Sequence, residues 1–387
     1  ESSAASDVYK RQIIFSQNIH VKHLYIFFFL KNCIDLKVTF IHNTIDNDSH
    51  CHNIGGGFRQ LMKNTFKILM MALAFILVLA ACGNDSQKET EKKENDAVTI
   101  KHALGTTEIK GEPKRVVTLY QGATDVAVAL GVKPVGAVES WAQQPKYDYL
   151  KDDLKNTKIV GQEPAPNLEE IAKLKPDLIV ASKVRNEKVY DQLSKIAPTI
   201  SQDTVYKFKD TTEMMGKALG KEKEADALLK KYDDKVAKFK KDAEAKYGDK
   251  WPLSASVVNF RADHTRIYAS GYAGDILHDL GFKRPEAQQK EVDKGKDIIQ
   301  LTSKESIPLM DADQIFVFKS DPTAKDAKLV KQTEDEWTSS NEWKNLDAVK
   351  KGHVAKNVDE ITWNLAGGYQ SSLKLIDDLY EKLDIKK

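Results

Sequence analysis

A proline-free stretch over residues 211–247 divides the chain and constrains its fold more than any other feature. Apolar residues recur in it at helical spacing, which predicts one long amphipathic α-helix. On both sides of it, short apolar strands alternate with helical segments, a pattern typical of sheets covered by helices. We therefore predict an α/β fold. Two Rossmann-like α/β lobes, at residues 98–210 and 249–387, are joined by the helical region at 211–248, with a ligand cleft between the lobes.

A weak internal repeat relates the two predicted lobes. Residues 125–131 and 275–281 both begin with Asp and a β-branched residue, and both end in Leu-Gly. An aspartate also precedes one apolar strand in each lobe, at Asp177 and at Asp313. Each Gly of the Leu-Gly pairs suits the left-handed end of a helix. The repeat favours duplication of one lobe.

Three segments precede the first lobe. Residues 1–61 lack methionine and hold five of the nine histidines, and we interpret them as translated upstream sequence without function. Residues 62–81 combine a basic start, a short apolar run and small residues before Cys82, the pattern of a bacterial lipoprotein signal. Cys82 is the expected lipid attachment point, and the polar residues 82–97 predict a flexible tether. We expect a lipid anchor on the outer face of a Gram-positive cell membrane; a retained membrane helix is the alternative.

Composition argues against several classes of function. The chain has 59 basic and 57 acidic residues, a net charge of +2, so we expect no nucleic-acid partner. Beyond Cys82 there is no further cysteine, which excludes a disulfide or a thiolate metal site there. The histidines after Cys82 are scattered, so we expect no metal ligand from the protein. Motifs for nucleophilic or phosphate chemistry are missing, and we expect no enzyme. A surface enzyme or chelatase is the alternative from another class.

Arginine is scarce after Cys82, so its positions are informative. Only five occur there, and lysine supplies almost all other positive charge. A guanidinium group grips a carboxylate through two hydrogen bonds, whereas an ammonium group is a hydrated point charge. Arg185 and Arg261 follow the ends of predicted strands, and Arg266 lies across a predicted tight hairpin. We predict that these three arginines bind an anionic ligand. The alternatives are a solvated loop for Arg185 and a pairing of Asp263 with one hairpin arginine.

Other polar and aromatic residues also fall near predicted strand ends. Polar-tipped aromatic side chains suit the wall of a site for an amphiphilic ligand. Packing between elements is the alternative for each of them. The further candidate ligand-binding residues are Tyr120, Gln121, Trp141, Tyr206, Lys207, Asn259, Tyr272, Trp363 and Asn364.

Several segments together resemble the iron-siderophore substrate-binding lipoproteins of bacterial ABC importers, in the class whose lobes are joined by a long helix. Within that family, residues 118–125 and 258–266 look like the receptors for staphyloferrin B. The other segments that carry the resemblance are the lipoprotein signal, the hairpin at residues 98–109, and the motifs at 113–117, 130–136 and 174–179.

The resemblance implies an activity and its partners. It implies that the protein binds a ferric carboxylate or hydroxycarboxylate siderophore, Fe(III)-staphyloferrin B in particular, and delivers it to ABC permease subunits in the membrane. The iron then arrives with its own chelator, so no intrinsic cofactor is expected. The resemblance also implies a monomer. Haem or cobalamin binding, as in other members of the superfamily, is the alternative.

The resemblance further implies a docking residue on each lobe and a limited motion. In the family an acidic residue before the Leu-Gly turn of each lobe meets the permease, and here Asp125 and Asp275 take those positions. The family has glutamate there, so this chain is one methylene shorter at both sites. Stabilisation of a helix N-terminus is the alternative role for both aspartates. A stiff linking helix implies a small hinge motion between the lobes.

Overall fold

A computed structural model describes residues 97–318 and 325–386 of the chain. All of these belong to one compact unit, Lys92–Lys387. The predicted upstream segment, the lipoprotein signal, Cys82 and all but the last residue of the predicted tether lie outside the described residues. Among the helices of the described part, none combines the length and the apolar character that crossing a membrane requires.

The N-terminal lobe is built on a parallel sheet. Strands β3 and β8 lie at its centre and are buried along their whole length, as expected when helices cover both faces of a parallel sheet. A separate antiparallel hairpin, β1 (Ala97–His102) and β2 (Gly105–Lys110), precedes the sheet. The five strands of the sheet, in spatial order, are β5 (Lys158–Ile159), β4 (Gly136–Ala137), β3 (Val116–Thr118), β8 (Leu178–Ser182) and β9 (Thr199–Gln202).

Short helices and a small strand pair complete this lobe. Helix α3 (Gln121–Ala129) follows β3 directly, and it ends before Gly131, whose φ of 75° is the left-handed value that the Leu-Gly pair predicts. The other elements are β6 (Gly161–Gln162), β7 (Ala165–Pro166), α4 (Leu168–Lys173), α5 (Lys183–Asn186), η1 (Glu187–Val189), α6 (Tyr190–Ile196) and α7 (Phe208–Ala218).

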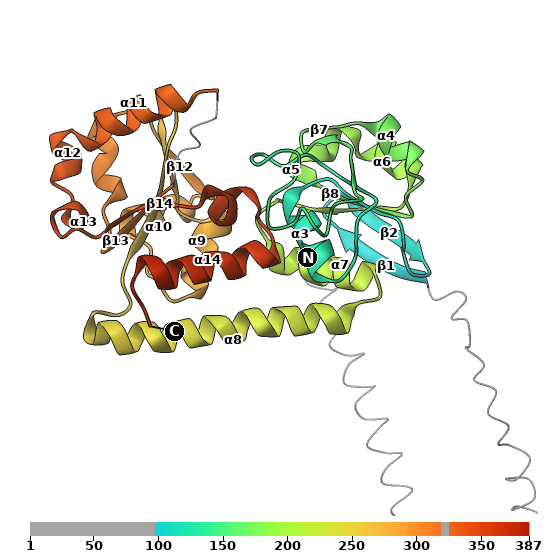
Figure 1. Ribbon diagram of the computed structural model, residues 1–387, viewed down its shortest axis with the longest axis horizontal. Coiled ribbons are helices and arrows are strands. Elements are labelled where there is room, and N and C mark those ends of the chain that lie inside the picture. The colour runs from blue at the N-terminus through green and yellow to red at the C-terminus, as the bar shows by residue number, and fades with distance from the viewer. Residues whose placement is uncertain (1–96, 319–324, 387) are drawn as a thin grey trace, which may run out of the picture. The chain divides into compact units, whose positions relative to one another are not determined.

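A long helix, α8 (Glu222–Tyr247), runs beside both lobes (Figure 1). The prediction of a single helix over residues 211–247 is wrong in its first part. Gly220 takes a left-handed φ of 64°, which ends α7 and starts a new helix direction. Helix α7 packs against α3 of the N-terminal lobe. The buried face of α8 consists of Ala225, Tyr232, Val236, Phe239 and Ala243.

The C-terminal lobe repeats the strand order of the first lobe with one change of direction. Its central strand β10 occupies the place of β3, but β11 pairs with β10 and β12 in antiparallel fashion, so this sheet is mixed. Strands β13 and β14 are parallel to β10 and to each other. The strands in spatial order are β12 (Ile298–Leu301), β11 (Thr265–Tyr268), β10 (Ala255–Phe260), β13 (Gln314–Phe318) and β14 (Val354–Val358).

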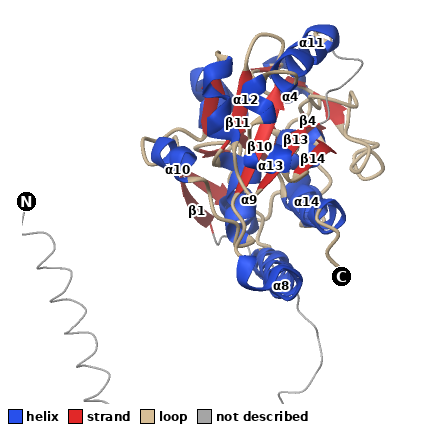
Figure 2. Cartoon of the chain, turned by 90° about the vertical axis from the view of Figure 1, so that its left-hand side faces the viewer, coloured by secondary structure: helices blue, strands red, loops and turns tan. Residues whose placement is uncertain are grey.

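Helices lie on both faces of this second sheet (Figure 2). Helix α9 (Gly271–Asp279) corresponds to α3, and Gly281 after it again has a left-handed φ, of 93°. The remaining elements are η2 (Gly248–Lys250), α10 (Glu286–Val292), η3 (Lys304–Met310), α11 (Ala327–Thr338), α12 (Asn341–Lys344), α13 (Asp347–Lys350), the π-helical turn η4 (Ile361–Leu365) and α14 (Tyr369–Lys382).

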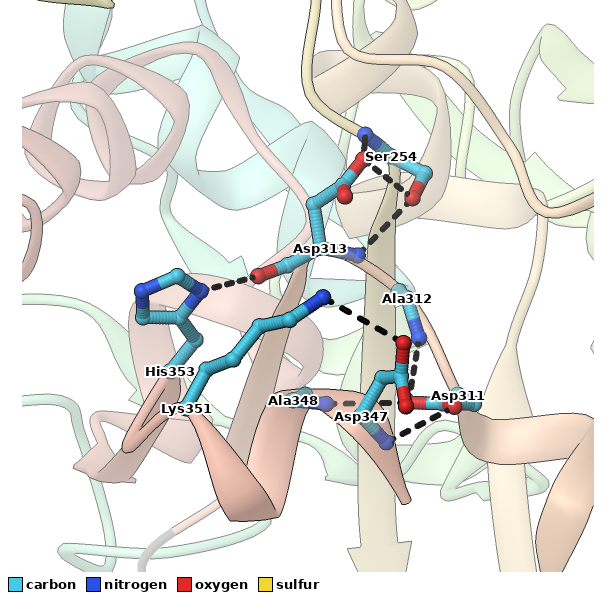
Figure 3. Close-up of polar contacts among 8 residues, drawn as sticks. All are labelled: Ser254, Asp311, Ala312, Asp313, Asp347, Ala348, Lys351 and His353. Carbon is cyan, nitrogen blue, oxygen red and sulfur yellow. Dashed lines mark hydrogen bonds and ion pairs between the residues drawn. The ribbon is translucent and has the colours of Figure 1, made fainter. Parts of the chain in front are cut away.

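The two aspartates of the sequence repeat perform the same structural task. The Asp177 carboxylate, before β8, accepts hydrogen bonds of 2.7 and 2.8 Å from the backbone N–H groups of Lys114 and Arg115, before β3. In the second lobe the Asp313 carboxylate accepts a 2.8 Å bond from the backbone N–H of Ser254, before β10 (Figure 3). Each carboxylate thus joins the starts of two adjacent central strands, which supports duplication of the lobe.

One hydrophobic core extends through both lobes. It includes Val116 of β3, Phe239 of α8, Phe316 of β13 and Leu375 of α14, all wholly buried. The lobes are therefore packed together through α8 and α14.

Candidate functional site

A pocket lies between the lobes at the carboxyl ends of the central strands, as the fold predicts. It holds about 720 Å³ of space, counted with its open mouth. Residues of both lobes line it, and the three predicted arginines are all among them. The lining residues are Gln121, Gly122, Trp141, Glu163, Arg185, Val205, Tyr206, Arg261, Arg266, Tyr268, Ile298, Asn364, Leu365, Ala366 and Gly367.

Arg185 enters the pocket from the N-terminal lobe. It lies on α5, which directly follows the buried strand β8. Its Nε lies 3.4 Å from Oε2 of Glu163, and its guanidinium carbon lies 5.8 Å from the ring centre of Trp141. Burial raises the pKa of Glu163, while the backbone N–H of Gln121 and the charge of Arg185 lower it. The Arg185 guanidinium therefore contacts both a carboxylate and an indole ring.

Arg261 and Arg266 enter from the hairpin between β10 and β11 in the C-terminal lobe. Nη1 of Arg261 lies 3.8 Å from Oε1 of Glu360. Nε of Arg266 donates a 3.0 Å hydrogen bond to Nε2 of His264. The antiparallel register confirms the tight hairpin that the sequence predicts here.

The residues that line the pocket carry more positive than negative charge, and they include both polar and apolar side chains. Its charged lining residues are the three arginines and Glu163, so the net charge is 3 − 1 = +2 when Glu163 is ionised. Tyr268 and Asn364 are joined by a 3.2 Å hydrogen bond from the amide to the phenol oxygen. Val205 and Ile298 add apolar surface. Converging guanidinium groups with aromatic neighbours suit a ligand that carries several carboxylates on a compact frame.

The structure brings seven of the predicted ligand-binding residues to the pocket and places three others in the core. Tyr120, Tyr272 and Trp363 are at most 2% exposed, so the prediction that they face the ligand is wrong. The Tyr120 hydroxyl pairs with Thr211, the Tyr272 hydroxyl donates to the Gly368 carbonyl, and the Trp363 indole donates to Asp378. The seven that line the pocket are Gln121, Trp141, Arg185, Tyr206, Arg261, Arg266 and Asn364.

Asn259 and Lys207 also lie outside the set of lining residues. Asn259 is buried on β10, and its amide nitrogen donates a 3.1 Å bond to Oε1 of Glu360, the carboxylate that also faces Arg261. Asn259 therefore contacts a carboxylate next to the pocket and does not line the pocket itself. Lys207 is exposed and precedes the first turn of α7, next to the lining residue Tyr206.

Sequence reasoning missed three polar residues that shape the site. Tyr268 lies two positions after Arg266 on the same strand, so alternation places both on one side of the sheet, and this signal was available. Glu163 follows a two-residue strand, and Glu360 precedes a π-helical turn. Neither context gives a pattern that points to a binding site.

The predicted docking role of Asp125 is wrong, because its carboxylate is fully buried. It accepts a 2.7 Å bond from the Tyr149 hydroxyl and bonds of 2.7 and 3.1 Å from the backbone N–H groups of Gln370 and Ser371. These two groups lie in the first turn of α14, so Asp125 joins α3 to α14 across the lobes. Asp275 is half-buried and accepts a 2.8 Å bond from Ser270.

A second hollow of the described residues does not suit an anionic ligand. Its lining carries five carboxylates and a single lysine, so it would repel a polycarboxylate. Within residues 97–318 and 325–386, no three His, Cys, Asp or Glu side chains come together as a possible metal site. The hollow lies along α14 and is lined by Asp359, Thr362, Lys374, Asp377, Asp378, Tyr380, Glu381, Asp384 and Ile385.

Comparison with known proteins agrees with this geometry. The periplasmic binding protein family (Peripla_BP_2) matches residues 116–357, more than half of the chain. The chain belongs to this family. Among curated proteins, it is 43% identical over 324 residues to the "Probable siderophore-binding lipoprotein YfiY" of Bacillus subtilis (strain 168), covering 82% of this chain and 98% of the relative. It is 38% identical over 268 residues to the achromobactin-binding periplasmic protein of Dickeya dadantii (strain 3937), covering 69% and 85% of the two chains.

A solved structure is more similar still. The crystal structure of Staphylococcus aureus SirA complexed with staphyloferrin B is 82% identical in sequence to this chain, with a TM-score of 0.73. The similarity covers 74% of this chain and 99% of SirA. The two curated relatives are binding proteins by name, and SirA was solved in complex with staphyloferrin B, in agreement with a fold of two lobes around a ligand pocket.

Proposed function

We propose that this protein is a receptor for ferric staphyloferrin B and delivers it to an ABC permease for iron uptake. The observation that carries the proposal is the convergence of Arg185, Arg261 and Arg266 from both lobes on one pocket. The 82% identity to SirA, solved with staphyloferrin B, supports the choice of ligand. A ferric complex of a carboxylate and hydroxycarboxylate chelator keeps negative charge, which matches the positive excess of the lining.

In this proposal the protein binds and does not catalyse. The guanidinium groups of the three arginines line the pocket and pair with carboxylate oxygens of the ligand, and Trp141 and Tyr206 pack against the ligand frame. Iron keeps the donor atoms of its chelator. The receptor acts as a monomer attached by lipid at Cys82 to the outer face of the cell membrane. Asp275 remains the proposed contact to a permease subunit from the C-terminal lobe.

Titration of the purified protein with ferric staphyloferrin B, followed by the fluorescence of Trp141 and the other tryptophans, tests the proposal. We expect stoichiometric binding without turnover. Replacing both Arg261 and Arg266 by alanine should weaken binding by about 4 kcal/mol, about a thousandfold in Kd, because each pairs with a carboxylate largely removed from water.

Arg115→Ala is the matched control, since Arg115 lies outside the pocket and donates to the backbone carbonyls of Leu174 and Lys175. It should bind like the unaltered protein. Unchanged affinity of the double variant would refute the role of the two arginines. Preferential binding of haem or cobalamin, or conversion of the chelate, would refute the proposed function itself.

A further inference from the structure

We propose that His264 and Asp263 are positioning residues for Arg266: the neutral imidazole of His264, fixed by Asp263, holds Nε of Arg266 so that its two terminal nitrogens face the ligand. This inference rests on the proposed function in so far as it concerns affinity. It also makes a claim about the empty protein that needs no ligand to be tested.

Strand geometry brings the two side chains together. His264 directly precedes β11, and Arg266 is the second residue of that strand, so the two side chains can meet beside the sheet. The distance from Nε of Arg266 to Nε2 of His264 is 3.0 Å, and that from Nδ1 of His264 to Oδ1 of Asp263 is 2.6 Å. The His264 side chain is only 12% exposed, whereas that of Asp263 is 84% exposed. The contact between arginine and histidine is therefore partly shielded from water.

The chemistry of the three groups fixes the proton on the ring. The Nε–H of arginine is always a donor, so Nε2 of His264 must be the acceptor and carries no proton. The single proton of the neutral ring then lies on Nδ1, where it is donated to the carboxylate of Asp263. The three residues form a directed chain that runs from guanidinium to imidazole to carboxylate.

The hairpin holds His264 in place. The His264 carbonyl accepts a 2.8 Å bond from the backbone N–H of Arg261, which closes the turn. The hydroxyl of Thr333 on α11 donates a 3.0 Å bond to the carbonyl of Ala262, which ties the turn to the helix packed against it. Since the backbone is fixed at both points, the imidazole provides a fixed acceptor for the arginine.

A fixed Nε has a direct consequence for binding. The side of the guanidinium group that carries Nε is occupied by His264, and the Tyr268 hydroxyl also hydrogen-bonds to Arg266, so an incoming carboxylate meets the side of the group that carries the terminal nitrogens. Protonation of His264 would place an N–H opposite the N–H of Arg266 and release the arginine from this position. The charged or titratable groups near this pair are Asp263, Arg261 and Arg266 on the hairpin, Tyr268 on β11 and Glu360 before η4.

Nitrogen-15 NMR of the histidine ring in the ligand-free protein tests the proton position. We expect the His264 signals to show a proton on Nδ1 and none on Nε2 at about pH 7.5. The Asp263→Asn variant should weaken this preference. A proton on Nε2 in the unaltered protein would overturn the proposal, whatever ligand the protein binds.

Titration with ferric staphyloferrin B tests the effect on affinity. His264→Ala should weaken binding about tenfold, because the arginine loses one directing hydrogen bond. His264→Gln should restore affinity to within about twofold, since the Gln amide oxygen can accept from Nε of Arg266.

His278→Gln, at an exposed position on α9, is the matched control and should leave the affinity unchanged. A double-variant cycle separates positioning from folding: adding Arg266→Ala to His264→Ala should weaken binding much less than Arg266→Ala does alone. Equal effects in both backgrounds would overturn the proposal. Absence of binding by the unaltered protein would instead refute the proposed function, and the NMR result would then decide the inference alone.

Discussion

The buried carboxylate of Asp125 makes stability depend on pH in a direction opposite to that of most aspartates. Burial raises its pKa from the usual 3.8 to about 6, although donation from Tyr149 and from the backbone N–H groups of Gln370 and Ser371 lowers it. The folded protein therefore binds a proton more tightly at this site than the unfolded chain does. The stabilising contribution of the neutral acid is complete below the unfolded pKa and is lost as pH rises through the folded pKa.

The magnitude follows from this difference. A rise of about two pKa units corresponds to about 3 kcal/mol of unfolding free energy. Asparagine does not titrate, so Asp125→Asn removes the dependence. We expect the unfolding free energy of the unaltered protein, relative to Asp125→Asn, to fall by about 3 kcal/mol between about pH 3 and pH 7.

Urea unfolding of both proteins across this pH range, followed by tryptophan fluorescence, measures the difference. Asp249→Asn is the control, because it makes the same chemical change at an aspartate that is exposed in η2. A difference that is constant, or that grows in favour of the unaltered protein as pH rises, would refute the reasoning. It would mean that the hydrogen bonds and the dipole of α14 outweigh the loss of hydration.

Two further predictions concern the join between the lobes and the membrane anchor. Gly368→Ala would place a Cβ in steric overlap with Cβ and Cγ of Asp125, so urea unfolding should show a loss of about 2 kcal/mol, and unchanged stability would contradict the close approach. Cys82→Ser should abolish incorporation of labelled fatty acid and release the protein into the culture medium, whereas retention on the cells would argue against lipid attachment at this position.

The fold could be predicted mainly from segments with a regular pattern of apolar residues. The apolar strands that became β8, β10 and β13 and the Leu-Gly helix ends were readable because burial on both faces of a sheet demands such sequences. The helices at Glu286–Val292 and Ala327–Thr338 were not predicted, because they are rich in polar residues and lie on the outside of the sheet. The break between α7 and α8 depended on a single glycine whose conformation a periodic pattern does not reveal.

The site was predicted in outline because arginine is rare in this chain and falls beyond strand ends. Position along a strand, however, does not tell whether a side chain points into the pocket or into the core. Tyr120 lies next to Gln121, yet its ring enters the core, whereas Gln121 lines the pocket. The carboxylates that hold the arginines come from distant segments, so their proximity appears only once the chain is folded.

The apolar core that continues from the first sheet through α8 and α14 to the second sheet has a consequence for how cargo is handed over. Swinging the halves apart would expose that core to water, so we expect the protein to present nearly the same surface with and without its chelate. A permease that distinguishes loaded from empty receptors would then have to do so at the rim of the pocket, where the chelate and the side chains that bind it lie.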